Sequence, residues 1–238
     1  MDYDLSKWTT IRVGGPDARG YLDGIITSNV NKPPDSIWMR SMMLSTKGKI
    51  HSTFWIQYKD GAFFLVCHPS SRAPLIEDLL KYNLNVAIKL EELSEELPPL
   101  VFEEGDKEIL ATGNLKGEFT WRNANNGGGF SEYLIDKAIC PPEFLLGTHP
   151  LEMGLLEAIS LEKGCFLGQE TVSRMYNRGK PRTKLVHVSG ENVGEFTRSE
   201  GFRILTSSKN SVLAIIPFNH DISEGMQLVG NYPPTHSL

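Results

Sequence analysis

The chain has 238 residues, of which 40% are hydrophobic and 22% are charged, and its formal net charge at pH 7 is −5. This composition is close to the average for globular proteins and excludes the disordered and collagen-like classes. The negative charge disfavours broad binding to a phosphate backbone, so we expect no nucleic-acid partner.

The N-terminal residues 1–13 lack the basic and then apolar pattern of a signal peptide. No uninterrupted apolar run approaches the ~20 residues that span a bilayer. We therefore expect a cytoplasmic protein with no membrane partner, or a mitochondrial matrix protein in a eukaryote, although the chain shows no transit peptide. Cys67, Cys140 and Cys165 are widely spaced without a CxxC pair, so neither a disulfide framework nor a metal site is predicted.

The first ninety residues predict strands with crossing helices. Residues 9–13 are strand-like, and residues 14–27 predict a helix opened by Pro16 and Asp17, because proline suits the first turn and an acid suits the positive helix end. A helix is also predicted over residues 70–82, followed by a strand at 86–90. Three strand-like runs joined by the turns STKG and KDG predict an antiparallel meander at residues 37–44, 49–58 and 62–67.

The elements so far predict an α+β fold. Residues 91–104 carry like charges four apart and a proline pair, which favours a solvated connector over a long helix. The glycine run at residues 123–129 lacks the spacing of a nucleotide-binding loop and predicts a turn. Further strand-like runs lie at residues 108–112, 117–121, 130–135, 184–189, 201–207, 211–218 and 226–230. We expect an α+β region over residues 1–183 and a small β domain over 184–238.

The octapeptide KGCFLGQE, residues 163–170, concentrates reactive side chains. A nearby cation such as Lys163, or the N-terminus of a helix that begins near Gly168, would favour the thiolate of Cys165. Gly164 and Gly168 would allow close approach of a ligand. The alternative is that Cys165 is a small buried hydrophobic residue in a glycine-rich turn. Residue chemistry alone leaves both interpretations open.

The same octapeptide resembles the K-G-C-[YF]-x-G-Q-E signature of the YgfZ-type folate-binding proteins, which are relatives of the glycine-cleavage aminomethyltransferase, the T-protein. The signature tyrosine is replaced here by Phe166. Other segments resemble this family in the same order along the chain: YLDGIITSNV, MLSTKGKI, HPLEMGLLEAIS and RGKPRTKL. The resemblance covers most of residues 5–190.

This resemblance implies an aminomethyltransferase-like fold of antiparallel sheets and crossing helices, followed by a short, truncated β-barrel-like domain. It implies tetrahydrofolate or a derivative as the bound cofactor, and a role in assembly or repair of iron-sulfur enzymes, with client or assembly proteins as partners. The implied site residues are Cys165 and Lys163 for chemistry and Trp8, Tyr133, Gly164, Gly168, Gln169 and Glu170 for folate binding. An indole such as Trp8 suits stacking on a flat ring.

The sequence departs from the T-protein where that family carries an Asp-Asp pair, because His51, Ser52 and Thr53 stand there. A hydroxyl cannot supply the charge or basicity of a carboxylate near pH 7, so glycine cleavage is disfavoured and a non-catalytic folate-binding protein is expected. The alternative is a folate-dependent aminomethyl- or methyltransferase with His51 as its base. A third hypothesis makes Cys165 a redox thiol or a transient cluster ligand, completed by another molecule because such clusters usually take four thiolates.

Overall fold

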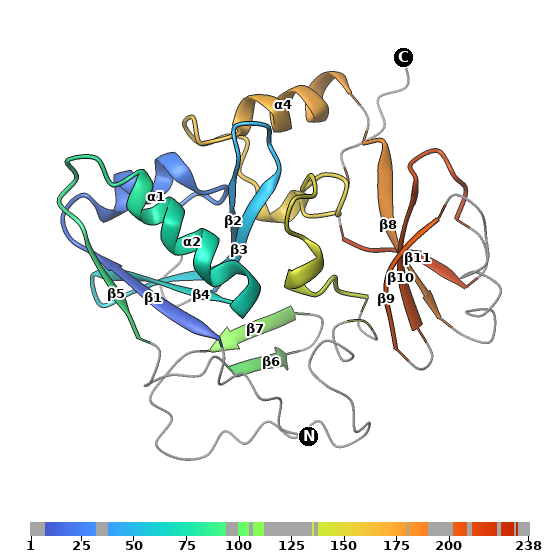
Figure 1. Cartoon of the computed structure of the whole chain (residues 1–238), viewed down its shortest axis with the longest axis horizontal. Helices are drawn as coiled ribbons and strands as arrows, with labels where there is room; N and C mark the ends of the chain where they lie inside the picture. The colour runs from blue at the N-terminus through green and yellow to red at the C-terminus, as the bar shows by residue number, and fades with distance from the viewer. Residues whose placement is uncertain are drawn as a thin grey trace. The chain divides into compact units, whose positions relative to one another are not determined.

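The computed structural model of the chain is drawn as a ribbon in Figure 1. It describes residues 8–31, 38–93, 135, 138–179, 181–189, 202–208, 211–222, 225–230 and 232, and the backbone of 100–104 and 107–111. The chain divides into two compact units. Unit 1 comprises residues 1–45, 51–127 and 158–167, and unit 2 comprises residues 46–50, 128–157 and 168–238. The expected boundary at residue 184 falls inside unit 2 and stays a prediction.

A five-stranded sheet forms the centre of unit 1, with the strand order β2-β3-β4-β1-β5. Its strands are β1 (Thr9–Gly14), β2 (Met39–Leu44), β3 (Ile50–Lys59), β4 (Ala62–Cys67) and β5 (Lys89–Glu92). The pairs β3–β4, β4–β1 and β1–β5 are antiparallel. Because β2, β3 and β4 follow one another in the chain and are also adjacent in the sheet, the predicted meander is confirmed.

Two helices, α1 (Ala18–Ile25) and α2 (Pro69–Lys81), supply apolar side chains to the core of unit 1. The helix α2 begins one residue before the predicted range 70–82. Pro69 occupies its first turn, and Nδ1 of His68 accepts a hydrogen bond from the amide of Ser70 at 3.2 Å. Leu80 is 60% exposed although it follows the apolar spacing of the helix. The buried core of unit 1 includes Leu22, Ile26, Phe54, Ile56, Phe63, Leu65, Leu75 and Leu79.

A two-stranded antiparallel sheet is formed by β6 (Leu100–Glu104) and β7 (Lys107–Ala111). The end of the expected connector over 91–104 is therefore a strand, because Leu100, Val101 and Phe102 favour extended backbone more strongly than the acidic residues before them oppose it. β7 confirms the strand-like run near residues 108–112. The strand-like run predicted at 117–121 and the turn predicted at 123–129 lie outside the described residues. Of the strand-like run predicted at 130–135 only Ile135 is described, and it is helical rather than extended.

Unit 2 contains a second antiparallel sheet with the strand order β11-β8-β10-β9. Its strands are β8 (Thr183–Ser189), β9 (Arg203–Ser207), β10 (Ser211–Pro217) and β11 (Met226–Leu228). All four strand-like runs predicted after Lys184 are thus confirmed as strands. In the part of the chain that the structure describes, these strands form an open sheet, and closure into the expected barrel is not confirmed.

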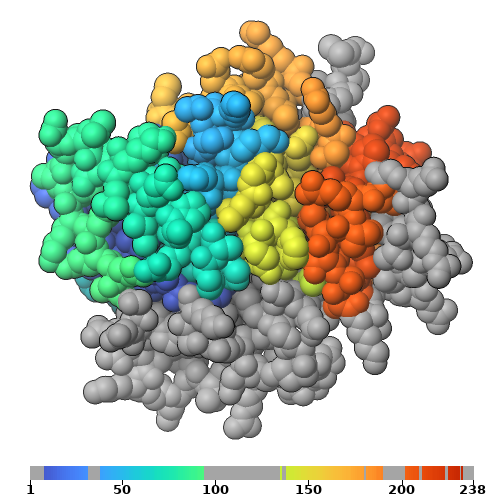
Figure 2. All heavy atoms as spheres, viewed as in Figure 1, coloured from blue at the N-terminus to red at the C-terminus, as the bar shows by residue number. Residues whose placement is uncertain are grey.

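In the described ranges the structure also has two short 3-10 helices, η1 (Pro142–Phe144) and η2 (Leu156–Ala158), and the helix α4 (Gln169–Arg178). In Figure 2, residues 138–157, coloured yellow, pack beside the orange and red C-terminal sheet of the same unit. No helix in the described ranges is both long and apolar enough to cross a membrane.

Candidate functional site

The segment Lys163–Leu167, called here the cysteine loop, belongs to unit 1 and presents one thiol to solvent. Cys165 is exposed, whereas Phe166 is only 6% exposed. The amide of Leu167 donates a hydrogen bond of 3.3 Å to the carbonyl oxygen of Gly24 at the end of α1. Cys165 therefore lies between buried anchors rather than inside a buried turn, which removes the alternative of a small buried hydrophobic residue.

Lys163 is the first of these anchors, and its side chain is fully buried. Its ammonium donates to the carbonyl oxygens of Asp23, Ile26 and Ser28 at 2.6, 2.8 and 2.9 Å, and it lies 3.3 Å from a carboxylate oxygen of Asp23. Burial lowers the pKa of this ammonium, and the charge of Asp23 opposes that change. Lys163 therefore caps the carboxyl end of α1, where carbonyl groups lack helical partners.

The second half of the octapeptide begins α4, as the sequence predicted. Gly168 is the N-cap residue with φ +81°, while Gly164 has open space where a side chain would stand. Glu170 is exposed and its carboxylate pairs with Arg174 at 2.6 Å, one helical turn later. Gln169 is the first residue of the helix. The predicted contacts of these residues with a folate stay predictions.

Trp8 lies in an aromatic cluster on unit 1. Its ring centroid is 5.5 Å from the rings of both Trp55 and His68, and the residue is 6% exposed. The guanidinium of Arg40 lies 5.7 Å from the ring of Trp55. Tyr133, the second aromatic residue expected at the site, lies outside the described residues.

The positions that replace the acids of the T-protein form polar contacts with α2. Nδ1 of His51 lies 2.6 Å from a carboxylate oxygen of Asp78, whose side chain is 5% exposed. The amide of Thr53 donates to the hydroxyl of Ser71 at 3.1 Å. Ser52 is fully buried, and its hydroxyl has no hydrogen-bond partner among the described residues. Asp78 was not predicted, although its place between Leu75 and Leu79 of one apolar helix is the sequence signal of a buried carboxylate.

Two segments of the resemblance, MLSTKGKI and HPLEMGLLEAIS, come together in unit 2 near the start of α4. A side chain at Gly48, in the turn between β2 and β3, would come within 2.9 Å of Cβ of Thr171 in the first turn of α4 and 3.5 Å of Nε2 of His149. His149 is 2% exposed, and burial lowers its pKa to about 4. His149 is therefore a neutral imidazole near pH 7, packed beside the β2–β3 turn.

The two other thiols of the chain are buried. Burial raises the pKa of Cys67 to about 12, and Sγ of Cys140 lies 3.7 Å from the carbonyl oxygen of Pro141. Among the described residues, no group of three or more His, Cys, Asp and Glu side chains is arranged to hold a metal ion.

The fold places the chain in a known structural class. It is similar to the crystal structure of glycine cleavage system aminomethyltransferase T from Bartonella henselae, with a TM-score of 0.66 over 97% of this chain and 85% of that chain, at 13% sequence identity. The chain therefore has the aminomethyltransferase-like α+β fold expected from its sequence. No family model matches it.

Sequence comparison points to a particular group within this fold. The chain is 20% identical to the "tRNA-modifying protein YgfZ" of Vibrio atlanticus over 94% of this chain and 85% of that protein. It is 27% identical to the protein of the same name from Klebsiella pneumoniae, over 78% and 70% of the two chains. It is 26% identical over 76% of its length to the "Iron-sulfur cluster assembly factor IBA57 homolog, mitochondrial" of Neurospora crassa, and spans about half (52%) of that protein. The predicted resemblance to the YgfZ-type proteins is confirmed.

Proposed function

We propose that this chain is a folate-binding accessory protein that supports the assembly or repair of iron-sulfur enzymes. The observation that carries the proposal is the cysteine loop, in which Cys165 is exposed between the buried residues Lys163 and Phe166. The names of the YgfZ and IBA57 relatives support a role linked to iron-sulfur clusters and RNA modification.

The aromatic cluster of unit 1 fits the chemistry of a folate. Thr10, Val66 and Trp55 are cross-strand partners in one row of the sheet, so they share a face. Oγ1 of Thr10 and Nε of Arg40 are buried and have no hydrogen-bond partner within the described ranges. Aromatic faces flanked by unsatisfied polar atoms suit a pterin, which combines a flat ring with hydrogen-bonding edges. When bound, tetrahydrofolate would supply a carrier for one-carbon units, and Trp8, Arg40 and Thr10 would orient it.

Cys165 is proposed to contact a partner or its cluster. A solvent-exposed thiol on a loop fixed at both ends can meet a second protein without unfolding of its own unit. Iron-sulfur clusters usually take four thiolates, so this single thiol would complete a ligand set supplied mainly by the partner. The cluster is therefore cargo in this proposal rather than a resident cofactor.

The test of folate binding is a titration with folinate, followed by quenching of tryptophan fluorescence. We expect saturable quenching, and about a tenfold weaker affinity for Arg40→Gln because a hydrogen-bond donor to the ligand is lost. Arg72→Gln is the matched control, since Arg72 is exposed and its guanidinium is already paired with Glu92 at 2.7 Å. Trp8→Phe should retain binding better than Trp8→Ala. No saturable signal at millimolar folinate would reject the proposal.

The iron-sulfur role is tested in cells that lack this protein. Activity of a cluster-dependent enzyme should fall and should return with the wild-type chain but not with Cys165→Ser. If Cys165→Ser restores the activity of the cluster-dependent enzyme as well as the wild-type chain does, the thiol has no part in this role. That result would leave the proposed folate binding unaffected.

A second candidate is a folate-dependent one-carbon transferase, favoured by the pair His51 and Asp78. A buried carboxylate bonded to Nδ1 holds an imidazole in the tautomer whose Nε2 can accept a proton, which is the arrangement of a general base. His51 is partly exposed, with 42% of its side chain accessible. Consumption of methylene-tetrahydrofolate with candidate amines, lost in His51→Gln, would establish this activity. Folinate binding without any turnover would exclude it.

A further inference from the structure

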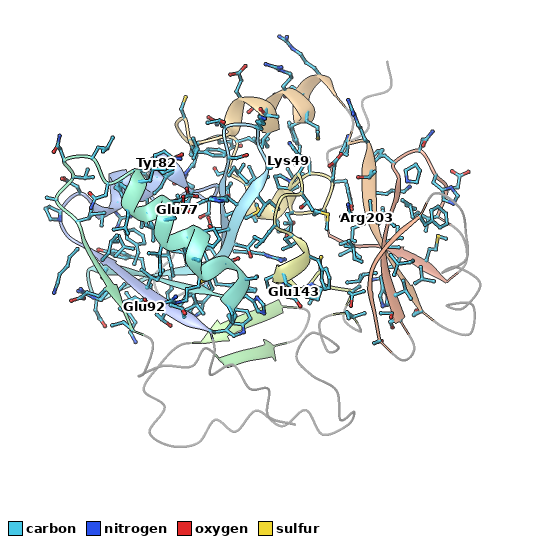
Figure 3. The ribbon with its side chains drawn as sticks, in the orientation of Figure 1. Lys49, Glu77, Tyr82, Glu92, Glu143 and Arg203 are labelled. Carbon is cyan, nitrogen blue, oxygen red and sulfur yellow. The ribbon has the colours of Figure 1, made fainter. Side chains whose placement is uncertain are left out.

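Unit 2 contains a cavity of about 370 Å³ that none of the site residues predicted from sequence lines. This volume lies within the range of small-molecule sites in proteins. The lining residues all belong to unit 2 and include Lys49, Glu152, Met153, Arg182, Arg203 and Ile215. Figure 3 labels two of them, Lys49 and Arg203.

The charge of this cavity is positive although the chain as a whole is negative. Three cations line it, Lys49, Arg182 and Arg203, against one carboxylate, Glu152. Lys49 lies 3.8 Å from that carboxylate, whereas neither arginine has a carboxylate within 4.0 Å in the described part of the chain. Two guanidinium groups therefore remain for a ligand, and their planar donors match carboxylate and phosphate oxygens.

One wall of the cavity is apolar and is formed by the end of the C-terminal sheet. In the ladder of β10, Pro217 faces Thr183 of β8 and Ile215 faces Arg203 of β9. The two flanking strands thus bring a hydroxyl and a guanidinium to the face of the sheet that carries Ile215 and Pro217. Met153 adds a flexible apolar side chain from the opposite segment. A ligand that fits this lining has both an anionic group and an apolar body.

Hydrogen bonds fix the segment that forms the other wall. The amide of Gly147 donates to the carbonyl oxygen of Ile50, and the amide of Ile50 donates to that of Thr148, both at 2.8 Å. These bonds attach the 147–148 turn to the start of β3, directly beside Lys49. Two backbone hydrogen bonds therefore fix the position of the backbone next to Lys49, on the cationic side of the cavity.

The two walls are also joined to each other. The hydroxyl of Tyr232 accepts from the amide of Leu185 at 2.6 Å and reaches the carbonyl oxygen of Glu152 at 3.4 Å. Burial raises the pKa of this phenol, so it stays protonated and keeps its donor. A side chain at Gly154 would lie 2.0 Å from the carbonyl oxygen of Val229, so the segments meet backbone to backbone. The cavity is therefore preorganised, which reduces the entropic cost of binding.

We propose that this cavity binds a small organic anion that carries a carboxylate or phosphate and an apolar body. Arg182, Arg203 and Lys49 would hold the anionic group, and Ile215, Pro217 and Met153 would cover the apolar part. The lining of this cavity shares no residue with the proposed folate cluster, because the lining belongs to unit 2 and the cluster to unit 1.

The test is calorimetric titration of the full chain at low salt with p-aminobenzoylglutamate, phenyl phosphate and neutral benzamide. We expect saturable binding of at least one anionic probe and none of benzamide. Arg182→Gln and Arg203→Gln should each weaken that binding at least about tenfold, since each removes a charged donor. Arg178→Gln is the matched control, because it is exposed at the end of α4 and does not line the cavity.

Two results would overturn the proposal: no binding of either anionic probe, or the same loss of affinity in all three arginine variants, which would indicate a diffuse electrostatic effect. Circular dichroism of each variant establishes that it is folded. Competition then identifies the source of the anion. Displacement of the probe by folinate but not by pteroate, which lacks glutamate, would assign the site to the tail of a folate. Absence of displacement would assign it to a separate metabolite, and either result upholds the cavity as an anion site.

Discussion

Nζ of Lys163 lies 2.6 Å from the carbonyl oxygen of Asp23, although 140 residues separate the two in the chain. Two further carbonyl oxygens, those of Ile26 and Ser28, accept from the same ammonium. The positive charge thus sits at the negative end of the α1 dipole. It connects the cysteine loop to a helix formed early in the sequence, so the position of the exposed thiol depends on this ammonium.

We expect Lys163→Met to destabilise the protein by about 3 kcal/mol, because the change leaves three carbonyl groups and the Asp23 carboxylate without their donor in a buried position. Urea unfolding followed by circular dichroism measures the effect. Lys47→Met is the control, since Lys47 is exposed in the β2–β3 turn. Equal stability of the two variants would contradict the capping role.

Thiol accessibility should separate the three cysteines. Cys165 should react with an alkylating reagent in the native protein, whereas Cys67 and Cys140 should react only after unfolding, because they are buried and burial raises the pKa of Cys67 to about 12. Mass spectrometry of peptides after a short pulse of iodoacetamide identifies the modified residue. The Cys165→Ser variant provides the control, and rapid native labelling of Cys67 would show the prediction to be wrong.

Stability should fall as the solution is acidified below pH 6.5. His149 has a folded-state pKa of about 4, below the ordinary value of 6.5, so the unfolded chain binds more protons than the folded one between these values. The free energy of unfolding therefore rises with pH across this interval, by up to about 3 kcal/mol from this residue. Urea denaturation at a series of pH values measures the slope. His149→Gln should reduce the slope between pH 4 and 6.5, and an unchanged slope would be inconsistent with a neutral buried imidazole.

Gly154→Ala should destabilise the protein by about 2 kcal/mol or more. Its φ is +69°, and a Cβ there would overlap the carbonyl oxygen of Val229, so both strain and a clash result. Gly147→Ala is the control, because it has a similar φ of +76° but open space around its Cβ. The difference in thermal unfolding between the two variants isolates the clash. The Gly154→Ala variant should also bind the anionic probe more weakly, because the clash displaces a wall of the cavity.

Local sequence patterns predicted most of the regular structure because tight turns and apolar periodicity determine these elements. The KDG turn joins β3 to β4 as predicted. The helix predicted over residues 14–27 is shorter, because α1 begins at Ala18, so that Asp17 is its N-cap residue and Pro16 lies before it. The length of β5 was not predictable in this way. Ile88 packs on the core but lies just outside that strand, whose bounds are set by pairing of Lys89–Glu92 with β1.

The sequence predicted which residues belong to the candidate site. It did not predict which other residues they contact. The motif indicated that Cys165 and Lys163 were special, yet nothing local to Lys163 shows that its ammonium reaches the end of α1, because that contact depends on the folded chain. The His51–Asp78 pair and the cavity of unit 2 were unpredictable for the same reason. Both join side chains distant in sequence, so neither periodicity nor motif spacing could reveal them.

The backbone contacts of residues 229–232 also fix the length of the chain there. The amide of Val229 donates to the carbonyl oxygen of Leu185 at 3.1 Å, Gly230 lies against Gly154, and the hydroxyl of Tyr232 accepts from the amide of Leu185. These three contacts, made by residues within four positions, fix the number of residues between them. Insertion or deletion of one residue between Val229 and Tyr232 would shift one attachment out of register, so natural length variation in homologous chains should fall elsewhere, and grafted tags should be placed outside this stretch.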